Sequence, residues 1–166
     1  MQVNALPLYP HLPRMTSLYG DVIISNHCPN SVYATEVGSS QTALRTLIPN
    51  QSTVFPIEVR DDGGFSIKIT TTNLDNGVLQ FEYTEQDDTL WWDLSLINKG
   101  NGTRMFVEEG INATTSCEGG KNVDCPAGDS CCHEVYQKPD DNQVIRVCEG
   151  YANITVNLCY GYADRT

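Results

Sequence analysis

An antiparallel β-sandwich is the fold class that this sequence predicts, and three observations lead to it. Short runs of alternating apolar and polar residues recur along the chain, and turn-forming residues separate them. No window keeps apolar residues at positions i, i+3, i+4 and i+7 over three helical turns. The chain has 166 residues, 13 glycines and 8 prolines, which is the length of one domain and too interrupted for a helical bundle.

The expected strands follow one another from residue 21 onward. Alternation places them at residues 22–25, 32–37, 54–59, 65–71, 78–83, 90–97, 105–107, 144–147 and 154–158. The segments between them contain Cys-Pro-Asn, Asp-Asp-Gly-Gly, Asp-Asn-Gly and Lys-Gly-Asn-Gly, which favour the tight reversals of antiparallel connections. Short strands in this succession are typical of a sandwich or a flattened barrel.

The two ends of the chain differ in composition from its middle. Residues 1–20 contain Pro7, Pro10 and Pro13, so the apolar core of roughly 7–15 residues that a signal peptide needs is not visible. We expect this segment to be a flexible leader and residues 21–166 to form a single domain. Within that domain, residues 117–148 are rich in glycine, cysteine and aspartate, which predicts a disulfide-rich loop region.

Charge and motifs exclude several classes of function. The formal net charge of −11 repels phosphate backbones and anionic lipids, so nucleic acid is not an expected partner. No apolar run approaches the ~20 residues that span a bilayer. Phosphate loops and dinucleotide fingerprints are missing, so no cofactor is expected. The cluster of Cys125, Cys131, Cys132 and His133 lacks repeated zinc-ligand spacing, and disulfides explain it better than a metal.

Seven cysteines and four Asn-x-Ser/Thr sequons indicate an oxidising, secretory environment. The sequons make Asn50, Asn101, Asn112 and Asn153 the candidate glycosylation sites. We therefore expect a secreted glycoprotein, in the extracellular space or at the cell wall.

Three segments resemble thaumatin-like proteins. Residues 25–34 (Ser-Asn-His-Cys-Pro-Asn-Ser-Val-Tyr-Ala) resemble the family's opening strand and turn, residues 92–97 (Trp-Asp-Leu-Ser-Leu-Ile) its Trp-Asp-Ile-Ser-Leu-Val strand, and residues 156–159 (Val-Asn-Leu-Cys) its last strand. The chain is far shorter than a full thaumatin-like protein. The region from Cys131-Cys132-His133 to Cys148 is similar to the short fungal relatives, the Blastomyces yeast-phase-specific or antigenic thaumatin-like group.

The resemblance implies a particular set of disulfides. It pairs Cys28 with Cys159, which join the first strand to the last. Cys117 with Cys148, and Cys125 with Cys131 or Cys132, would complete three bridges. One thiol is then left over, either buried and inert or available to link a monomer into a covalent dimer.

Alternation also predicts an exposed patch on the strand at residues 90–97. Its odd-numbered side chains, among them Trp91 and Asp93, point outward, whereas its even-numbered apolar residues face the core. In the preceding strand Gln80 and Glu82 point outward. If residues 84–89 form the hairpin loop and Tyr83 lies opposite residue 90, then Gln80 lies opposite Asp93 and Glu82 opposite Trp91. The candidate ligand-binding residues are therefore Trp91, Asp93, Gln80 and Glu82.

An indole beside carboxylates suits carbohydrate, because the ring packs on a sugar face while the acids accept hydroxyl protons. Full-length thaumatin-like proteins bind, and some hydrolyse, β-1,3-glucan in an acidic cleft. The family's aspartate matches Asp93, but its other cleft residues fall on Gln80, Asn98 and Ser66. The resemblance thus implies a reduced site.

Three functions stay open at this stage. The first is a non-enzymatic extracellular protein that contacts cell-wall polysaccharide or a host surface, as an antigen or effector. The second is a β-1,3-glucan hydrolase that uses Glu82 and Asp93, although two solvated surface carboxyls are expected to titrate normally. The third is a structural or protein-interaction module, in which Trp91 meets protein or is covered by the C-terminal loops.

Overall fold

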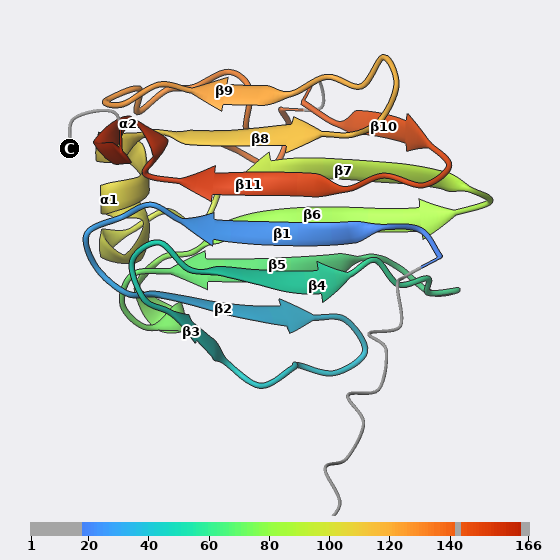
Figure 1. Ribbon diagram of the computed structural model, residues 1–166, viewed down its shortest axis with the longest axis horizontal. Coiled ribbons are helices and arrows are strands. Elements are labelled where there is room, and N and C mark those ends of the chain that lie inside the picture. The colour runs from blue at the N-terminus through green and yellow to red at the C-terminus, as the bar shows by residue number, and fades with distance from the viewer. Residues whose placement is uncertain (1–17, 142–143, 164–166) are drawn as a thin grey trace, which may run out of the picture.

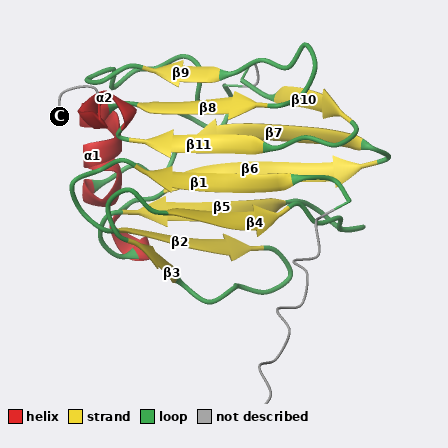
Figure 2. Cartoon of the chain, in the orientation of Figure 1, coloured by secondary structure: helices red, strands yellow, loops and turns green. Residues whose placement is uncertain are grey.

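Two β-sheets stacked on each other form the body of the protein, and strands dominate the chain (Figures 1 and 2). The structure is a computed structural model that describes residues 18–141 and 144–163. One sheet has the order β4 (Ser52–Pro56), β1 (Asp21–Asn26), β11 (Ile154–Leu158), β8 (Ile111–Thr115) and β9 (Val123–Cys125). The other has the order β10 (Arg146–Glu149), β7 (Thr89–Ser95), β6 (Leu79–Gln86), β5 (Phe65–Thr70), β2 (Val32–Val37) and β3 (Arg45–Leu47).

The expected fold class is confirmed. Neighbouring strands are antiparallel except for β1 and β11, which are parallel. Helices α1 (Asn101–Glu109) and α2 (Tyr160–Ala163) lie at one end of the sandwich (Figure 2), and the single turn η1 (Leu74–Asn76) precedes β6. None of the helices in the described part of the chain has the length and apolar character needed to cross a membrane.

The core lies between the two sheets and is filled by alternate residues of their strands. Ile24 of β1 and Val156 of β11 are fully buried from one side, and Phe81 of β6 and Trp92 of β7 from the other. The rings of Phe81 and Trp92 stack with their centroids 5.6 Å apart. Since side chains alternate across a strand, the residues between these point to the outer faces.

The prediction of a strand at residues 105–107 is wrong, because these residues lie in α1. The helix is too short to show three turns of apolar periodicity, but its first turn is capped. The Thr103 hydroxyl accepts a hydrogen bond from the Gly100 N–H and donates one to the Gly100 carbonyl, both at 3.0 Å. Phe106 inserts into the core. The short strands β3, β8 and β9 were not expected from the sequence.

The expected register between β6 and β7 is also wrong, because the hairpin that joins them is shorter than a loop at residues 84–89. Asp87 and Asp88 have φ angles of 54° and 59° and reverse the chain by themselves. Glu82 therefore lies opposite Asp93, and Trp91 opposite Thr84. The pairing is displaced by two residues, which leaves every side chain on the face that alternation predicts.

Two disulfides are present. Cys28 is bonded to Cys159, with an S–S distance of 1.99 Å, and Cys125 to Cys132, with 2.02 Å. The third bridge that the resemblance implies is not formed. Cys117 and Cys148 are thiols whose side chains are hydrogen-bonded to each other, and burial, this hydrogen bond and the neighbouring Cys148 raise the pKa of Cys117 to about 11.

Cys131 is a thiol exposed on the surface. The thiolate is the reactive form, so an exposed cysteine reacts faster than one that is covered and has a raised pKa, such as Cys117. We expect the native protein to show one rapidly reacting thiol in an aromatic disulfide titration. Cys131→Ser should abolish the fast phase, whereas Cys117→Ser should keep it. A fast phase that survives in Cys131→Ser would contradict this assignment.

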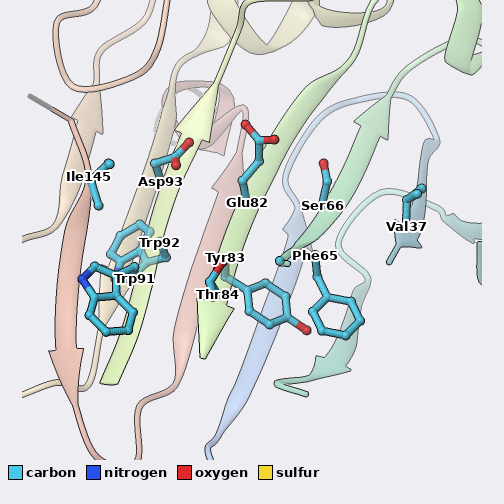
Figure 3. A pocket seen from close by; sticks show the side chains of 11 residues that line it. Val37, Phe65, Ser66, Glu82, Tyr83, Thr84, Trp91, Trp92, Asp93 and Ile145 are labelled. Carbon is cyan, nitrogen blue, oxygen red and sulfur yellow. The ribbon is translucent and has the colours of Figure 1, made fainter. Parts of the chain in front are cut away.

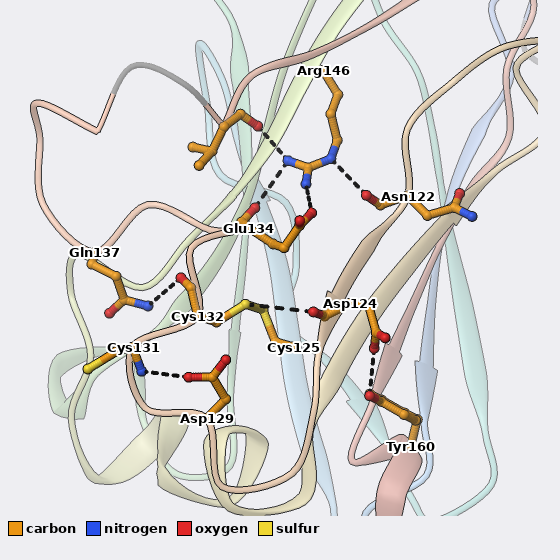
Figure 4. The surroundings of a disulfide bond; sticks show 11 residues. Asn122, Asp124, Cys125, Asp129, Cys131, Cys132, Glu134, Gln137, Arg146 and Tyr160 are labelled. Carbon is orange, nitrogen blue, oxygen red and sulfur yellow. Dashed lines mark hydrogen bonds and ion pairs between the residues drawn. A yellow bond between two sulfur atoms is a disulfide. The ribbon is translucent and has the colours of Figure 1, made fainter.

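Arg146 of β10 connects the described part of the disulfide-rich loop region to the sandwich (Figure 4). Its side chain is 7% exposed and forms an ion pair with Glu134. It also donates hydrogen bonds to the carbonyls of Asn122, Glu134 and Val144. The guanidinium lies over the Trp92 ring, 5.5 Å from its centroid. The loop region is therefore held by a buried arginine as well as by the Cys125–Cys132 disulfide.

Most of the expected leader, residues 1–17, lies outside the described residues. Its last part belongs to the sandwich. The Tyr19 carbonyl accepts a hydrogen bond from the Ala152 N–H at 3.1 Å, and the Gly20 carbonyl accepts one from the Ile57 N–H at 2.9 Å.

Candidate functional site

Three polar side chains form a row across the outer face of the six-stranded sheet. Ser66 of β5 lies opposite Glu82 of β6, and Glu82 lies opposite Asp93 of β7. Directly opposite residues on adjacent strands have Cβ atoms roughly 4.5–5.5 Å apart. The two carboxyl groups accordingly face each other from neighbouring strands, with the Ser66 hydroxyl beside them (Figure 3).

This row forms the floor of a shallow pocket of about 390 Å³. Trp91 borders one side, next to Ile145, and Phe65 and Val37 lie toward the other (Figure 3). The Trp91 side chain is 38% exposed, and its cross-strand neighbour Val147 is exposed as well. An apolar rim thus adjoins a polar floor, which is the combination found in sites for small ligands.

Burial changes the titration of both carboxyls in the row. It raises the pKa of Asp93 to about 7, with a further contribution from the negative charge of Glu82, and the positive charge of Arg146 opposes this. Burial also raises the pKa of Glu82, with Lys68 acting in the opposite direction. The expectation of two normally titrating carboxyls is therefore wrong. Both side chains are half-buried in the lining of the pocket rather than fully solvated.

Two buried polar atoms in the row have no hydrogen-bond partner among the described residues. They are the Ser66 hydroxyl oxygen and the Asp93 Oδ1 atom. Buried polar groups in native proteins are nearly always hydrogen-bonded to protein or to water. The residues Ser66 and Asp93 both belong to the lining of the pocket, so the two atoms without a partner lie at its floor.

The structure brings together three of the four expected ligand-binding residues. Trp91, Glu82 and Asp93 line the pocket, whereas Gln80 lies opposite Ser95 and outside the lining. Ser95 was expected to point to solvent but is buried, because residue Tyr136 pairs beside it. Trp91 is exposed, so the C-terminal loops, as far as the structure describes them, do not cover it.

Sequence reasoning missed the part that Ser66 and Ile145 play in the pocket. Ser66 appeared only as a departure from the family's cleft arginine, and its pairing with Glu82 depends on the β5–β6 register. Ile145 directly precedes β10, whose position beside β7 no local pattern indicated. A single sequence carries no signal for either contact.

The sequons differ in their surroundings. Asn50 and Asn101 are exposed, in a turn and at the start of α1. Asn112 and Asn153 are half-buried, and their side-chain oxygens accept hydrogen bonds from the Asn157 amide at 2.7 Å and from the Asp21 N–H at 3.0 Å. No cluster of three or more potential metal ligands occurs among the residues that the structure describes.

Comparisons with known proteins give a consistent result. A family model described as Blastomyces yeast-phase-specific protein matches residues 10–160. The chain is 34% identical over 156 residues to the "Secreted thaumatin-like protein calA" of Emericella nidulans, covering 93% of this chain and 88% of that protein. It is 28% identical over 144 residues to an "Antigenic thaumatin-like protein" of Arthroderma benhamiae, covering 86% and 72%.

Two solved structures have a similar fold. The protein elicitor MoHrip2 from Magnaporthe oryzae superposes with a TM-score of 0.68 at 21% identity, covering 84% of this chain and 98% of that one. The thaumatin-like xylanase inhibitor TLXI gives a TM-score of 0.56 at 13% identity, covering 83% and 98%. At these identities the likeness concerns the fold alone.

Proposed function

Because the chain belongs to the family of the Blastomyces yeast-phase-specific protein and is thaumatin-like, we propose that it is a secreted extracellular protein that binds cell-wall polysaccharide without cleaving it. The binding surface in this proposal is the pocket on the outer face of the six-stranded sheet. Two disulfides and a relative named as secreted support the extracellular location.

One observation carries the proposal. The pocket floor has two buried polar atoms without a partner, Ser66 Oγ and Asp93 Oδ1, and the exposed Trp91 ring stands at its rim. A sugar presents hydroxyl groups to polar atoms and an apolar face to an aromatic ring, so it matches both parts of this surface.

The same site has one feature that favours a glycoside hydrolase as a second candidate. Asp93 has a pKa raised to about 7, as a catalytic acid needs, and Glu82 is a second carboxyl beside it. Both carboxyls, however, stand side by side on one sheet rather than on opposite walls of a cleft. This arrangement supports binding over cleavage.

A protein partner is the alternative that the solved structures suggest. One of them is named an elicitor and the other a xylanase inhibitor, and both names refer to effects on other proteins or on a host. In that case the exposed Trp91, Ile145 and Val147 would meet a protein surface.

A pull-down on insoluble β-1,3-glucan, chitin and cellulose tests the proposal. We expect selective retention of the wild-type protein, and at least about tenfold weaker retention of Trp91→Ala, because a central aromatic contact carries much of the energy of such a surface. Tyr151→Ala is the matched control, since Tyr151 is 54% exposed and outside the pocket lining.

Each outcome of this experiment has a definite meaning. Equal retention of Trp91→Ala and the wild type would contradict binding through this pocket. Reducing sugar released from the same samples, and lost in Asp93→Asn, would establish the hydrolase instead. No retention on any of the three polymers would overturn both carbohydrate functions and leave a protein partner.

A further inference from the structure

We propose that Glu82 and Asp93 bind ligand as a pair that shares a single proton, so that the pocket selects neutral saccharides over acidic ones and takes up a proton on binding. This inference rests on the proposed function, because it concerns the same pocket. It adds the class of saccharide and the dependence of binding on pH.

The geometry of the pair is the first step of the argument. Glu82 and Asp93 are direct cross-strand neighbours, both half-buried, and their carboxyl groups stand next to each other on the same face of the sheet (Figure 3). Two carboxylates that share a site in this way disfavour double ionisation, so the pair keeps one proton to a higher pH than an isolated carboxyl does.

The charges around the pair do not neutralise it. The ion pairs among the described residues involve neither Glu82 nor Asp93. The positive charge of Lys68 in β5 opposes the rise in the pKa of Glu82, and that of Arg146 in β10 opposes the rise in the pKa of Asp93. Arg146, however, is already paired with Glu134. Tyr136, beside the end of β7, has its own pKa raised by burial and by both carboxylates. The second negative charge therefore has no dedicated counterion.

The singly protonated pair offers complementary groups to a sugar. Protonated Asp93 donates a hydrogen bond, ionised Glu82 accepts one, and the Ser66 hydroxyl does either. Neighbouring hydroxyls of a neutral saccharide can both donate and accept, so they satisfy the unpartnered Asp93 Oδ1 and Ser66 Oγ atoms. A ligand carboxylate would instead meet the negative charge that remains on the pair.

Proton uptake follows from the desolvation that binding causes. A bound saccharide removes water from the floor of the pocket, which disfavours the doubly charged pair further. Binding and protonation are then linked, and each strengthens the other. Affinity for a neutral saccharide should fall as the pH rises through the range in which Asp93 ionises.

Isothermal titration calorimetry tests this with soluble β-1,3-gluco- and β-1,4-xylo-oligosaccharides as neutral probes and an oligogalacturonide as the acidic probe. With Asp93 titrating at about 7, we expect neutral probes to bind up to about 30-fold more weakly at about pH 8.5 than at about pH 5.5. Repeating the titration near pH 7 in buffers of different ionisation enthalpy counts the protons taken up by the wild type.

Two variants accompany the wild-type titrations. Asp93→Asn should lose most of the pH dependence, since the amide neither gains nor loses a proton over this range. Glu118→Gln removes an exposed carboxyl outside the pocket and should keep the dependence.

The results separate the two levels of the proposal. Wild-type protein that binds no saccharide at either pH overturns the proposed function. Saccharide binding without proton uptake, equal affinity for the acidic probe, or pH dependence that persists in a folded Asp93→Asn variant overturns this inference alone.

Discussion

Replacing Cys28 and Cys159 together by serine is expected to lower the free energy of unfolding by about 4–5 kcal/mol. The bridge spans 131 residues of sequence, and a cross-link that closes so long a loop removes much of the entropy of the unfolded chain. It lies at the ends of β1 and β11, the parallel neighbours at the centre of their sheet, where Asn26 is in register with Leu158. Single domains have a total stability of about 5–15 kcal/mol, so the loss is a large part of it.

Urea denaturation measures this effect, and the second disulfide provides its control. Cys125 and Cys132 are only seven residues apart, so their replacement by serine should cost about 2 kcal/mol by the same argument. Both pairs of cysteines are buried, so the serine substitutions are made in similar environments in the two variants. Equal losses of stability in the two double variants would show that loop length does not govern the effect.

Much of the fold was predictable because alternation along a strand is a local property. The inward side chains of β6 and β7, such as Phe81 and Trp92, and the outward ones, such as Glu82 and Trp91, could be assigned from their order alone. The family resemblance supplied the architecture and the pairing of Cys28 with Cys159, and the structure has both. Neither conclusion required knowledge of which residues lie opposite each other.

The site was less predictable, because its geometry depends on one turn. The sequence Asp87–Asp88 contains no glycine, so a two-residue reversal with both φ angles positive was not expected. Because of that turn, the residue opposite Glu82 is Asp93, whereas Trp91 was expected there. The proximity of the two carboxyls follows from this register, and the position of Ser66 follows from the β5–β6 register. Burial, which is the main cause of the raised pKa values, depends on the tertiary structure.

The same dependence on tertiary structure separates a functional carboxyl from a merely structural one. Buried polar atoms in native proteins are nearly always hydrogen-bonded, whereas Asp93 Oδ1 is buried without a partner, beside another acid and in the lining of a pocket. Such a group destabilises the folded state when it is ionised, and proteins tolerate this cost mainly where a site needs the group. Stability therefore provides a test of this site that does not require the ligand.

Asp93→Asn is expected to stabilise the protein at alkaline pH. The pKa of Asp93 is raised from its ordinary 3.8 to about 7, so the folded state holds a proton that the unfolded state releases between these values. Its stabilising contribution is present in full below about pH 4 and is lost as the pH rises through about 7. The difference between the two pKa values corresponds to about 4 kcal/mol, which partial solvent exposure of the carboxyl reduces to about 2 kcal/mol.

Urea denaturation of the wild type and the variant at about pH 4 and about pH 8.5 measures the effect. The two proteins should be nearly equal in stability at the lower pH, because the amide resembles the protonated acid, and the variant should be more stable at the higher pH. Asp61→Asn removes an exposed carboxyl and should change stability little at either pH. If Asp93→Asn were less stable than the wild type at both pH values, Asp93 would be a satisfied structural carboxylate, and the argument for a ligand on the pocket floor would lose its main support.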